Sequence, residues 1–204
     1  MNIILLSTAT VLGLLAFFEP CTIATHTLFA VRTHHGPARQ RWLVLLNLLL
    51  SRTVLLAILF GSAAWVGLSA ITQYQAFIIL VAIGSIYLLT RKIYLPVPHL
   101  EFFRLLPGHI NLSQGLKLGL TLPTCTLPLV AVVGVNAALS QQPAAALLAG
   151  VIFAAMFSLP TLWGSVRGLK AAHLTFLGKA ASVSPYITAL LLWGAALIIL
   201  LTGV

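Results

Sequence analysis

Long apolar runs separated by short polar segments dominate the pattern of this chain. A helix needs roughly 20 residues to cross a hydrocarbon core of about 30 Å, because each residue adds about 1.5 Å. Six runs approach or exceed this length, and the third, which begins after the polar residues 73–75, is the shortest. The pattern therefore predicts six transmembrane helices, over residues 3–31, 42–68, 76–90, 116–139, 144–162 and 186–202.

The composition agrees with a membrane protein and excludes a soluble enzyme. Of the 204 residues, 60% are hydrophobic and 6% charged, and the mean hydropathy is +1.10. Soluble domains carry about a quarter charged residues. The net charge of +9 would suit nucleic-acid binding, but such a protein needs a water-soluble scaffold for its basic residues. We therefore expect contact with a lipid bilayer and no nucleic-acid partner.

The basic residues predict an orientation in the membrane. Basic loops stay in the cytoplasm, and the second and fourth connections carry no Lys or Arg. We therefore predict a bacterial-type cytoplasmic membrane protein with both termini outside. No Lys or Arg precedes the first run, so we interpret it as a retained helix, not a signal peptide. All but one of the 11 basic residues, the exception being Arg52, fall in the first, third and fifth connections: Arg32, Arg39 and Arg41; Arg91, Lys92, Arg104 and Lys117; Arg167, Lys170 and Lys179.

The six predicted helices divide into two halves of three. An odd number of helices per half makes the halves enter the membrane from opposite sides, which is what an inverted repeat requires. We expect one all-α polytopic membrane domain, made of a first repeat over residues 1–95, a cytoplasmic linker over 96–115 and a second repeat over 116–204.

Proline accompanies cysteine in the first helix of each half. Pro20 precedes Cys21, and Pro123 and Pro128 flank Cys125. Proline inside a helix leaves carbonyl groups without partners, which a bilayer tolerates only where they are buried in protein or line a polar cavity. We therefore predict a break in each of these helices and a shared interior site. A lone cysteine would more often be a small buried hydrophobe, but the repetition of the pattern favours a function.

Two cysteines without a local CxxC spacing need the fold to bring them together. Equivalent positions near a pseudo-two-fold axis can approach each other, and disulfide formation requires alpha carbons about 4.4 to 6.8 Å apart. Such a pair could cycle between dithiol and disulfide by thiol exchange. Amides at a half-helix N-terminus would stabilise a thiolate there.

These residues resemble the CcdA and DsbD family of transmembrane thiol-disulfide transporters. That family carries Pro-Cys in both first helices, with another proline three residues after the cysteine. Pro20-Cys21 matches the first part of the motif, with Ala24 at the position of the second proline, and Cys125 to Pro128 matches the second part. The resemblance implies a carrier of two electrons from cytoplasmic thioredoxin to an extracytoplasmic thioredoxin-like protein or apocytochrome c. Cys21 and Cys125 would be its redox pair.

Two charged residues and a histidine within the predicted helices are candidate modulators. An intramembrane ionisable residue is a functional candidate by default. Glu19 could modulate the Cys21 thiol, pair with Arg52 or bind a cation. For His26 we weigh a role as proton carrier or ligand against a polar packing contact, and favour the packing contact.

Smaller residues near the breaks have simpler expected roles. Thr22 and Thr126 are expected to bond backbone carbonyls, as threonine often does in membrane helices. Gly115 and Gly119 form a GxxxG pattern, which permits close approach of another helix. With the three prolines, these threonines complete the predicted support of the site.

Two other classes of function stay open from the sequence. The same breaks could serve a transporter of a small solute or a soft metal ion, with Glu19, Cys21, His26 and Cys125 as ligands, since thiolates suit soft metals. The protein could also be a structural membrane subunit with inert cysteines. We find no cofactor-binding motif and no metal-ligand spacing, so we expect neither a bound cofactor nor a resident metal.

Overall fold

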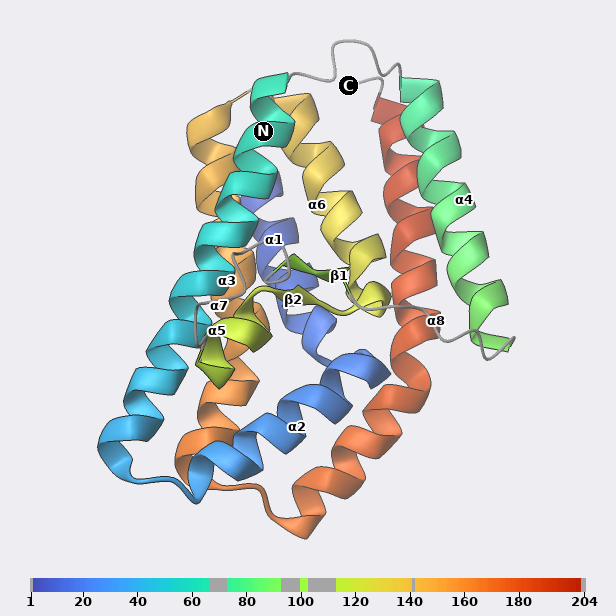
Figure 1. Ribbon diagram of the computed structural model, residues 1–204. Coiled ribbons are helices and arrows are strands. Elements are labelled where there is room, and N and C mark those ends of the chain that lie inside the picture. Colours follow the sequence, from blue (N-terminus) through green and yellow to red (C-terminus); the bar gives the residue numbers. More distant parts are fainter. Residues whose placement is uncertain (1, 67–72, 93–99, 103–112, 141, 203–204) are drawn as a thin grey trace.

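The computed structural model describes residues 2–66, 73–92, 100–102, 113–140 and 142–202, which are almost entirely helical (Figure 1). In chain order the elements are α1 (Asn2–Phe17), α2 (Pro20–His34), α3 (Ala38–Val66), α4 (Gln73–Lys92), β1 (Leu100–Glu101), α5 (Gln114–Gly119), β2 (Thr121–Leu122), the 3-10 turn η2 (Thr124–Thr126), α6 (Leu127–Ser140), α7 (Pro143–Arg167) and α8 (Ala171–Thr202).

Several of these helices fit a bilayer by length and apolar composition. Within the described residues, α3, α7 and α8 are each long and apolar enough to span it, and the bent pair α1 and α2 adds a fourth if it counts as one span. α4 and α6 contain shorter apolar segments, Phe77–Leu89 and Thr124–Ser140. A helical chain compatible with a membrane is thus confirmed, whereas six spans and the inverted repeat stay predictions.

The first predicted break lies where the sequence places it. α1 and α2 meet at an angle of 72°. Pro20 is the first residue of α2 and Glu19 is its N-cap. Proline is well suited to a first helical position, since the amide hydrogen it lacks has no partner there in any case. Pro20 therefore starts a new helix in a new direction, while Phe18 donates its backbone N–H to Leu15 and closes the last turn of α1.

The second break is wider than a proline kink. Between α5 and α6 the chain forms β2 and then η2, with Pro123 as the N-cap of η2 and Pro128 in the first turn of α6. β1 pairs antiparallel with β2, joining Glu101 to Thr121, and Phe102 donates to the Leu120 carbonyl at 3.1 Å. A buried chain that leaves the helix needs such partners for its peptide groups. A short segment of the linker between the halves thus completes the break.

α5 is held against α3 through the two glycines of the GxxxG pattern. A β-carbon on Gly115 would lie 2.0 Å from the Val44 carbonyl oxygen, and one on Gly119 would lie 1.8 Å from Ser51 Oγ. Both glycines are buried. Ser113 caps the start of α5, accepting from the Leu116 amide at 3.3 Å. The predicted close approach is therefore confirmed, and it fixes the helix that leads into the second break.

The apolar core lies mainly among α1, α3, α6 and α7, while α4 and α8 pack chiefly on each other. Phe60, Phe153 and Phe157 are fully buried in this core. Gly150 of α7 brings α7 against the α3 backbone, since its β-carbon would lie 2.7 Å from atoms of Ala57. The α4 and α8 pair is thus the more separate part of the fold, as Figure 1 shows.

Helix boundaries differ from the apolar pattern where charges begin. α8 begins at Ala171 rather than at residue 186, so Lys179 lies in a helix and not in the fifth connection. Arg39 and Arg41 likewise belong to the first turn of α3. Hydropathy marks the part of a helix that fits the hydrocarbon core, while long basic side chains extend to the headgroups from turns beyond it. Most of the predicted linker, including residue 104, lies outside the described residues.

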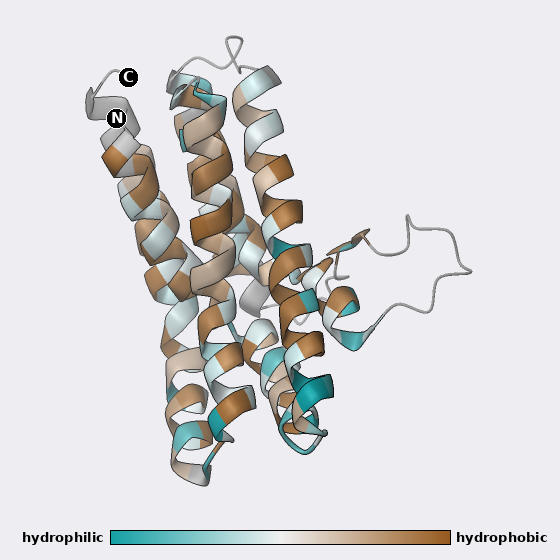
Figure 2. Ribbon diagram, turned by 90° about the vertical axis from the view of Figure 1, so that its left-hand side faces the viewer, coloured by the Kyte–Doolittle hydropathy of each residue, from teal (hydrophilic) through white to brown (hydrophobic). Residues whose placement is uncertain are grey.

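Polar residues gather at one end of the molecule. Figure 2 shows hydrophilic colouring at the end where α2 turns into α3 and α7 into α8, and mostly apolar colouring along the helices. Arg32 and His34 lie in the last turn of α2 and Arg167 in the last turn of α7. α1 begins and α8 ends at the opposite side (Figure 1). The two ends of the fold therefore differ in charge.

Candidate functional site

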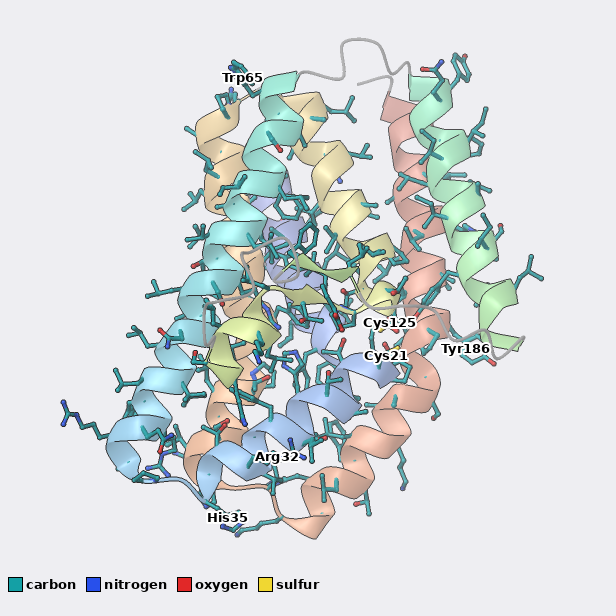
Figure 3. The ribbon with its side chains drawn as sticks, viewed as in Figure 1. Cys21, Arg32, His35, Trp65, Cys125 and Tyr186 are labelled. Carbon is teal, nitrogen blue, oxygen red and sulfur yellow. The ribbon has the colours of Figure 1, made fainter. Side chains whose placement is uncertain are left out.

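Cys21 and Cys125 lie together at the starts of two helices. Cys21 is the second residue of α2, and Cys125 lies in η2, directly before α6. Figure 3 shows their side chains adjacent near the middle of the molecule. Cys125 is 9% exposed, whereas Cys21 is only partly buried. The fold thus joins two residues that are distant in sequence, as predicted.

Both thiols occupy the positive end of a helix. The first amides of a helix have no carbonyl partner within it, and the summed peptide dipoles favour negative charge there. The Thr22 hydroxyl lies 3.9 Å from Cys125 Sγ, so it faces the partner cysteine and not, as expected from the sequence, a backbone carbonyl. Thr126 instead donates its hydroxyl to the Pro123 carbonyl at 2.7 Å, as expected for a threonine beside a break. The Thr22 hydroxyl is therefore a polar group next to the Cys125 sulfur, while the Thr126 hydroxyl stabilises the backbone of the break.

Glu19 ties this region to α4 and α8. Its side chain is 0% exposed. Tyr87 of α4 donates its hydroxyl to Oε2, and Thr188 of α8 donates its hydroxyl to Oε1 at 2.5 Å. Hydrogen bonds to an ionised acceptor are about twice as strong as neutral ones. The carboxylate two positions before Cys21 is thus held from two helices that otherwise pack chiefly on each other.

A second buried polar cluster surrounds Arg52 of α3. Its guanidinium donates to the Leu118 carbonyl at 3.1 Å and to Ser158 Oγ at 3.3 Å. It also lies 4.2 Å above the centre of the Phe157 ring. Arg52 is 0% exposed, and a charge buried in an apolar interior requires partners of this kind.

His26 joins α2 to this cluster. Arg52 Nη2 lies 3.2 Å from His26 Nε2, and His26 Nδ1 lies 2.5 Å from Thr161 Oγ1. Because arginine only donates, Nε2 accepts and Nδ1 carries the hydrogen that Thr161 receives. His26 is buried and stacks on Phe157. The structure therefore gives His26 the polar packing contact that we favoured.

Arg52 is positioned as a counter-charge for the end of α5. Leu118 lies in the last turn of α5, whose final carbonyls lose their helical partners at the break. A positive group at a helix C-terminus is stabilising. Within the described part of the chain no ion pair joins Arg52 to Glu19, so the sequence alternative of a Glu19 and Arg52 pair is not what forms. The Glu19 carboxylate instead contacts α4 and α8, whereas Arg52 contacts α5, α7 and His26 of α2.

Four partners of the site were not identified from the sequence: Tyr87, Thr188, Ser158 and Thr161. They lie on α4, α7 and α8, in helices that are apolar on most faces, and hydroxyl residues are common in membrane helices. Nothing in their local sequence distinguishes them from hydroxyls bonded within their own helix, such as Thr10, which donates to the Leu6 carbonyl at 2.8 Å.

Two further features of the structure concern ligand binding. A cavity of about 350 Å³ lies between α1, α6 and α8, with mostly apolar lining, and neither cysteine lines it. In the parts of the chain that the structure describes, no three residues of the types His, Cys, Asp and Glu come together as metal ligands.

Comparison of the chain with protein families, curated proteins and solved structures finds no match.

Proposed function

We propose that this protein is a membrane-embedded thiol-disulfide carrier that moves two electrons from cytoplasmic thioredoxin to an extracytoplasmic thioredoxin-like protein or apocytochrome c. One observation carries the proposal. The only two cysteines of the chain come from different halves of the sequence and lie next to each other (Figure 3), Cys21 at the start of α2 and Cys125 directly before α6. Two thiols side by side inside an apolar protein have a direct use in disulfide exchange.

The proposed cycle balances electrons and sulfur bonds. A thiolate of reduced thioredoxin attacks the Cys21–Cys125 disulfide, forming a mixed disulfide and releasing the other cysteine as a thiolate, which takes up a proton. The second thioredoxin thiol then attacks the mixed disulfide, so thioredoxin leaves oxidised and the carrier keeps a dithiol. The dithiol reduces the disulfide of the extracytoplasmic acceptor by the same exchange and returns to the disulfide form.

Exposure supports Cys21 as the sulfur that forms the mixed disulfide. Cys21 is partly exposed, whereas Cys125 is buried and its sulfur lies against the Thr22 hydroxyl. Disulfide exchange requires access along the line of attack. We therefore assign the partner-facing role to Cys21 and the resolving role to Cys125.

The six-span inverted repeat belongs to the same proposal. In it, α1 with α2 and α5 with α6 form the two broken spans, and α3, α4, α7 and α8 form the rest. Support comes from the two breaks, each of which has a cysteine at the start of the helix that follows it. The basic end of the fold faces the cytoplasm in this arrangement, with both termini outside.

A mass-tag experiment tests the redox pair. Membranes are oxidised, treated with a thiol-reactive mass tag with or without prior reduction, and analysed by electrophoresis. We expect the wild type to take up tags only after reduction, and Cys21→Ser and Cys125→Ser to take up one tag in both conditions. If the wild-type thiols react fully under oxidising conditions, the cysteines do not cycle and the proposal fails.

Trapping tests the order of attack and the partner. A thioredoxin that lacks its second, resolving cysteine is expected to stay bound to the oxidised wild-type carrier as a mixed disulfide, because nothing then releases it. Peptide mapping of the trapped complex is expected to find Cys21 in the bond to thioredoxin. Finding Cys125 there would exchange the two roles, and no trapped complex would remove thioredoxin as the donor. Orientation is tested separately, because a tag placed in the linker between the halves should be accessible only from the cytoplasm.

A further inference from the structure

The Glu19 carboxylate joins the cysteine region to both α4 and α8. Tyr87 and Thr188 donate to its two oxygens, and Glu19 is the N-cap of α2, whose second residue is Cys21. The Glu19 carbonyl also accepts from the Ile23 amide at 2.9 Å, which closes the first turn of α2. A shift of Glu19 would therefore move the turn that carries Cys21.

The contact is not explained as capping of the helix. Although Glu19 is the N-cap residue, its side chain makes no capping hydrogen bond. It turns instead toward hydroxyls on α4 and α8. Burying a carboxylate is unfavourable unless hydrogen bonds compensate, so these two donors decide where the carboxylate lies. The direction of the side chain thus links the first break to the α4 and α8 pair.

We propose that Glu19 is a positioning residue, which holds the start of α2 so that Cys21 stays opposite Cys125. The inference concerns the cysteine pair of the proposed carrier and rests on that function for its use. Arg52 of α3 holds α2 on its other side, because it bonds His26 of α2, the Leu118 carbonyl of α5 and Ser158 of α7. The first turn of α2 is thus fixed from the α4 and α8 side by Glu19.

Bridging by dibromobimane measures this role without any redox step. This reagent links two thiols only when they lie close together. The bridging rate is divided by the rate at which monobromobimane labels the same thiols, so that changes in thiol reactivity cancel. The fully reduced protein in nanodiscs is used. We expect Tyr87→Phe and Thr188→Val each to lower the normalised bridging rate by about tenfold, because hydrogen bonds to a charged group contribute on that scale.

Matched controls and a mutant cycle separate positioning from a general loss of structure. Tyr74→Phe and Thr175→Val remove the same hydroxyls from exposed places on α4 and α8, and both should bridge like the wild type. Glu19→Ala should lower bridging about as much as the Tyr87 and Thr188 changes combined, and adding those changes to Glu19→Ala should have no further effect.

The glutamine variant distinguishes position from charge. Glu19→Gln keeps the size of the side chain and can still bond both hydroxyls, one as acceptor and one as donor, so it should bridge within about threefold of the wild type. The inference is overturned if Glu19→Gln falls as far as Glu19→Ala, or if Tyr87→Phe and Thr188→Val bridge like their controls. A wild type that bridges well but never forms a disulfide would refute the proposed function alone.

Discussion

Adding one methyl group at Gly115 should separate α5 from α3. In the wild type the backbone of α5 lies directly on α3, and a β-carbon at residue 115 would stand 2.0 Å from the Val44 carbonyl oxygen. Real β-carbon contacts stay above 3.0 Å, and the obstacle is main chain that cannot rotate away. Gly115→Ala therefore requires the two helices to move apart by about 1 Å, against a packed interior that deforms little.

The expected cost follows from overpacking. Forcing extra atoms into a packed core costs about 1–3 kcal/mol. Gly134→Ala in α6 is the matched control, since a β-carbon there meets nothing within 4 Å. That change should instead stabilise by about 0.5–1 kcal/mol, because alanine loses less backbone entropy than glycine in a helix. The two alanine variants should thus differ in the free energy of unfolding by about 1.5–4 kcal/mol.

Denaturant or thermal unfolding in nanodiscs, followed by intrinsic tryptophan fluorescence, measures this difference. Movement of α5 also draws the Leu118 carbonyl away from Arg52, 3.1 Å distant in the wild type, so the bridging of Cys21 to Cys125 should fall in Gly115→Ala and stay unchanged in Gly134→Ala. Equal unfolding midpoints for the two variants would refute the reasoning that backbone contact through Gly115 holds the second break.

Other predictions follow from single contacts. Arg52→Met removes the donor to the Leu118 carbonyl and to the His26 ring, and each acceptor left unsatisfied costs about 1–3 kcal/mol. The variant should therefore unfold at a lower denaturant concentration than the wild type. Equal unfolding midpoints would contradict the role assigned to this cluster. Leu56→Ala, at a fully buried position, should lower the free energy of unfolding by about 2–5 kcal/mol, while Leu46→Ala, which is 55% exposed, should change it little in the same denaturant series. Pro20→Ala should allow α1 and α2 to straighten, which should lower the rate at which dibromobimane bridges Cys21 and Cys125. Bridging at the wild-type rate would show that the bend does not depend on the proline.

The positions of the two breaks could be predicted because proline acts locally. Pro20 cannot continue the ladder of α1, and Pro123 cannot donate into a helix, whatever surrounds them. The form of the second break could not be predicted. Its peptide groups form backbone hydrogen bonds with Glu101 and Phe102. These two residues come from another part of the chain, and their local sequence does not predict strand pairing.

The candidate site divides in the same way. Cys21, Cys125 and Glu19 were identifiable because they are rare residue types in an apolar chain, where any reactive or ionisable group requires an explanation. Tyr87 and Thr188 were not identifiable, because a hydroxyl on an apolar helix becomes part of a site only through what lies opposite it.

The sequence by itself determined a helical chain compatible with a membrane, its two breaks and the small set of residues able to do chemistry. These follow from transfer of side chains between water and lipid and from the geometry of proline, both of which act residue by residue. Only the tertiary structure decided that Glu19 and Arg52 have separate partners and that Cys21 lies next to Cys125, because hydrogen bonds and thiol contacts depend on distances between helices that no local pattern encodes.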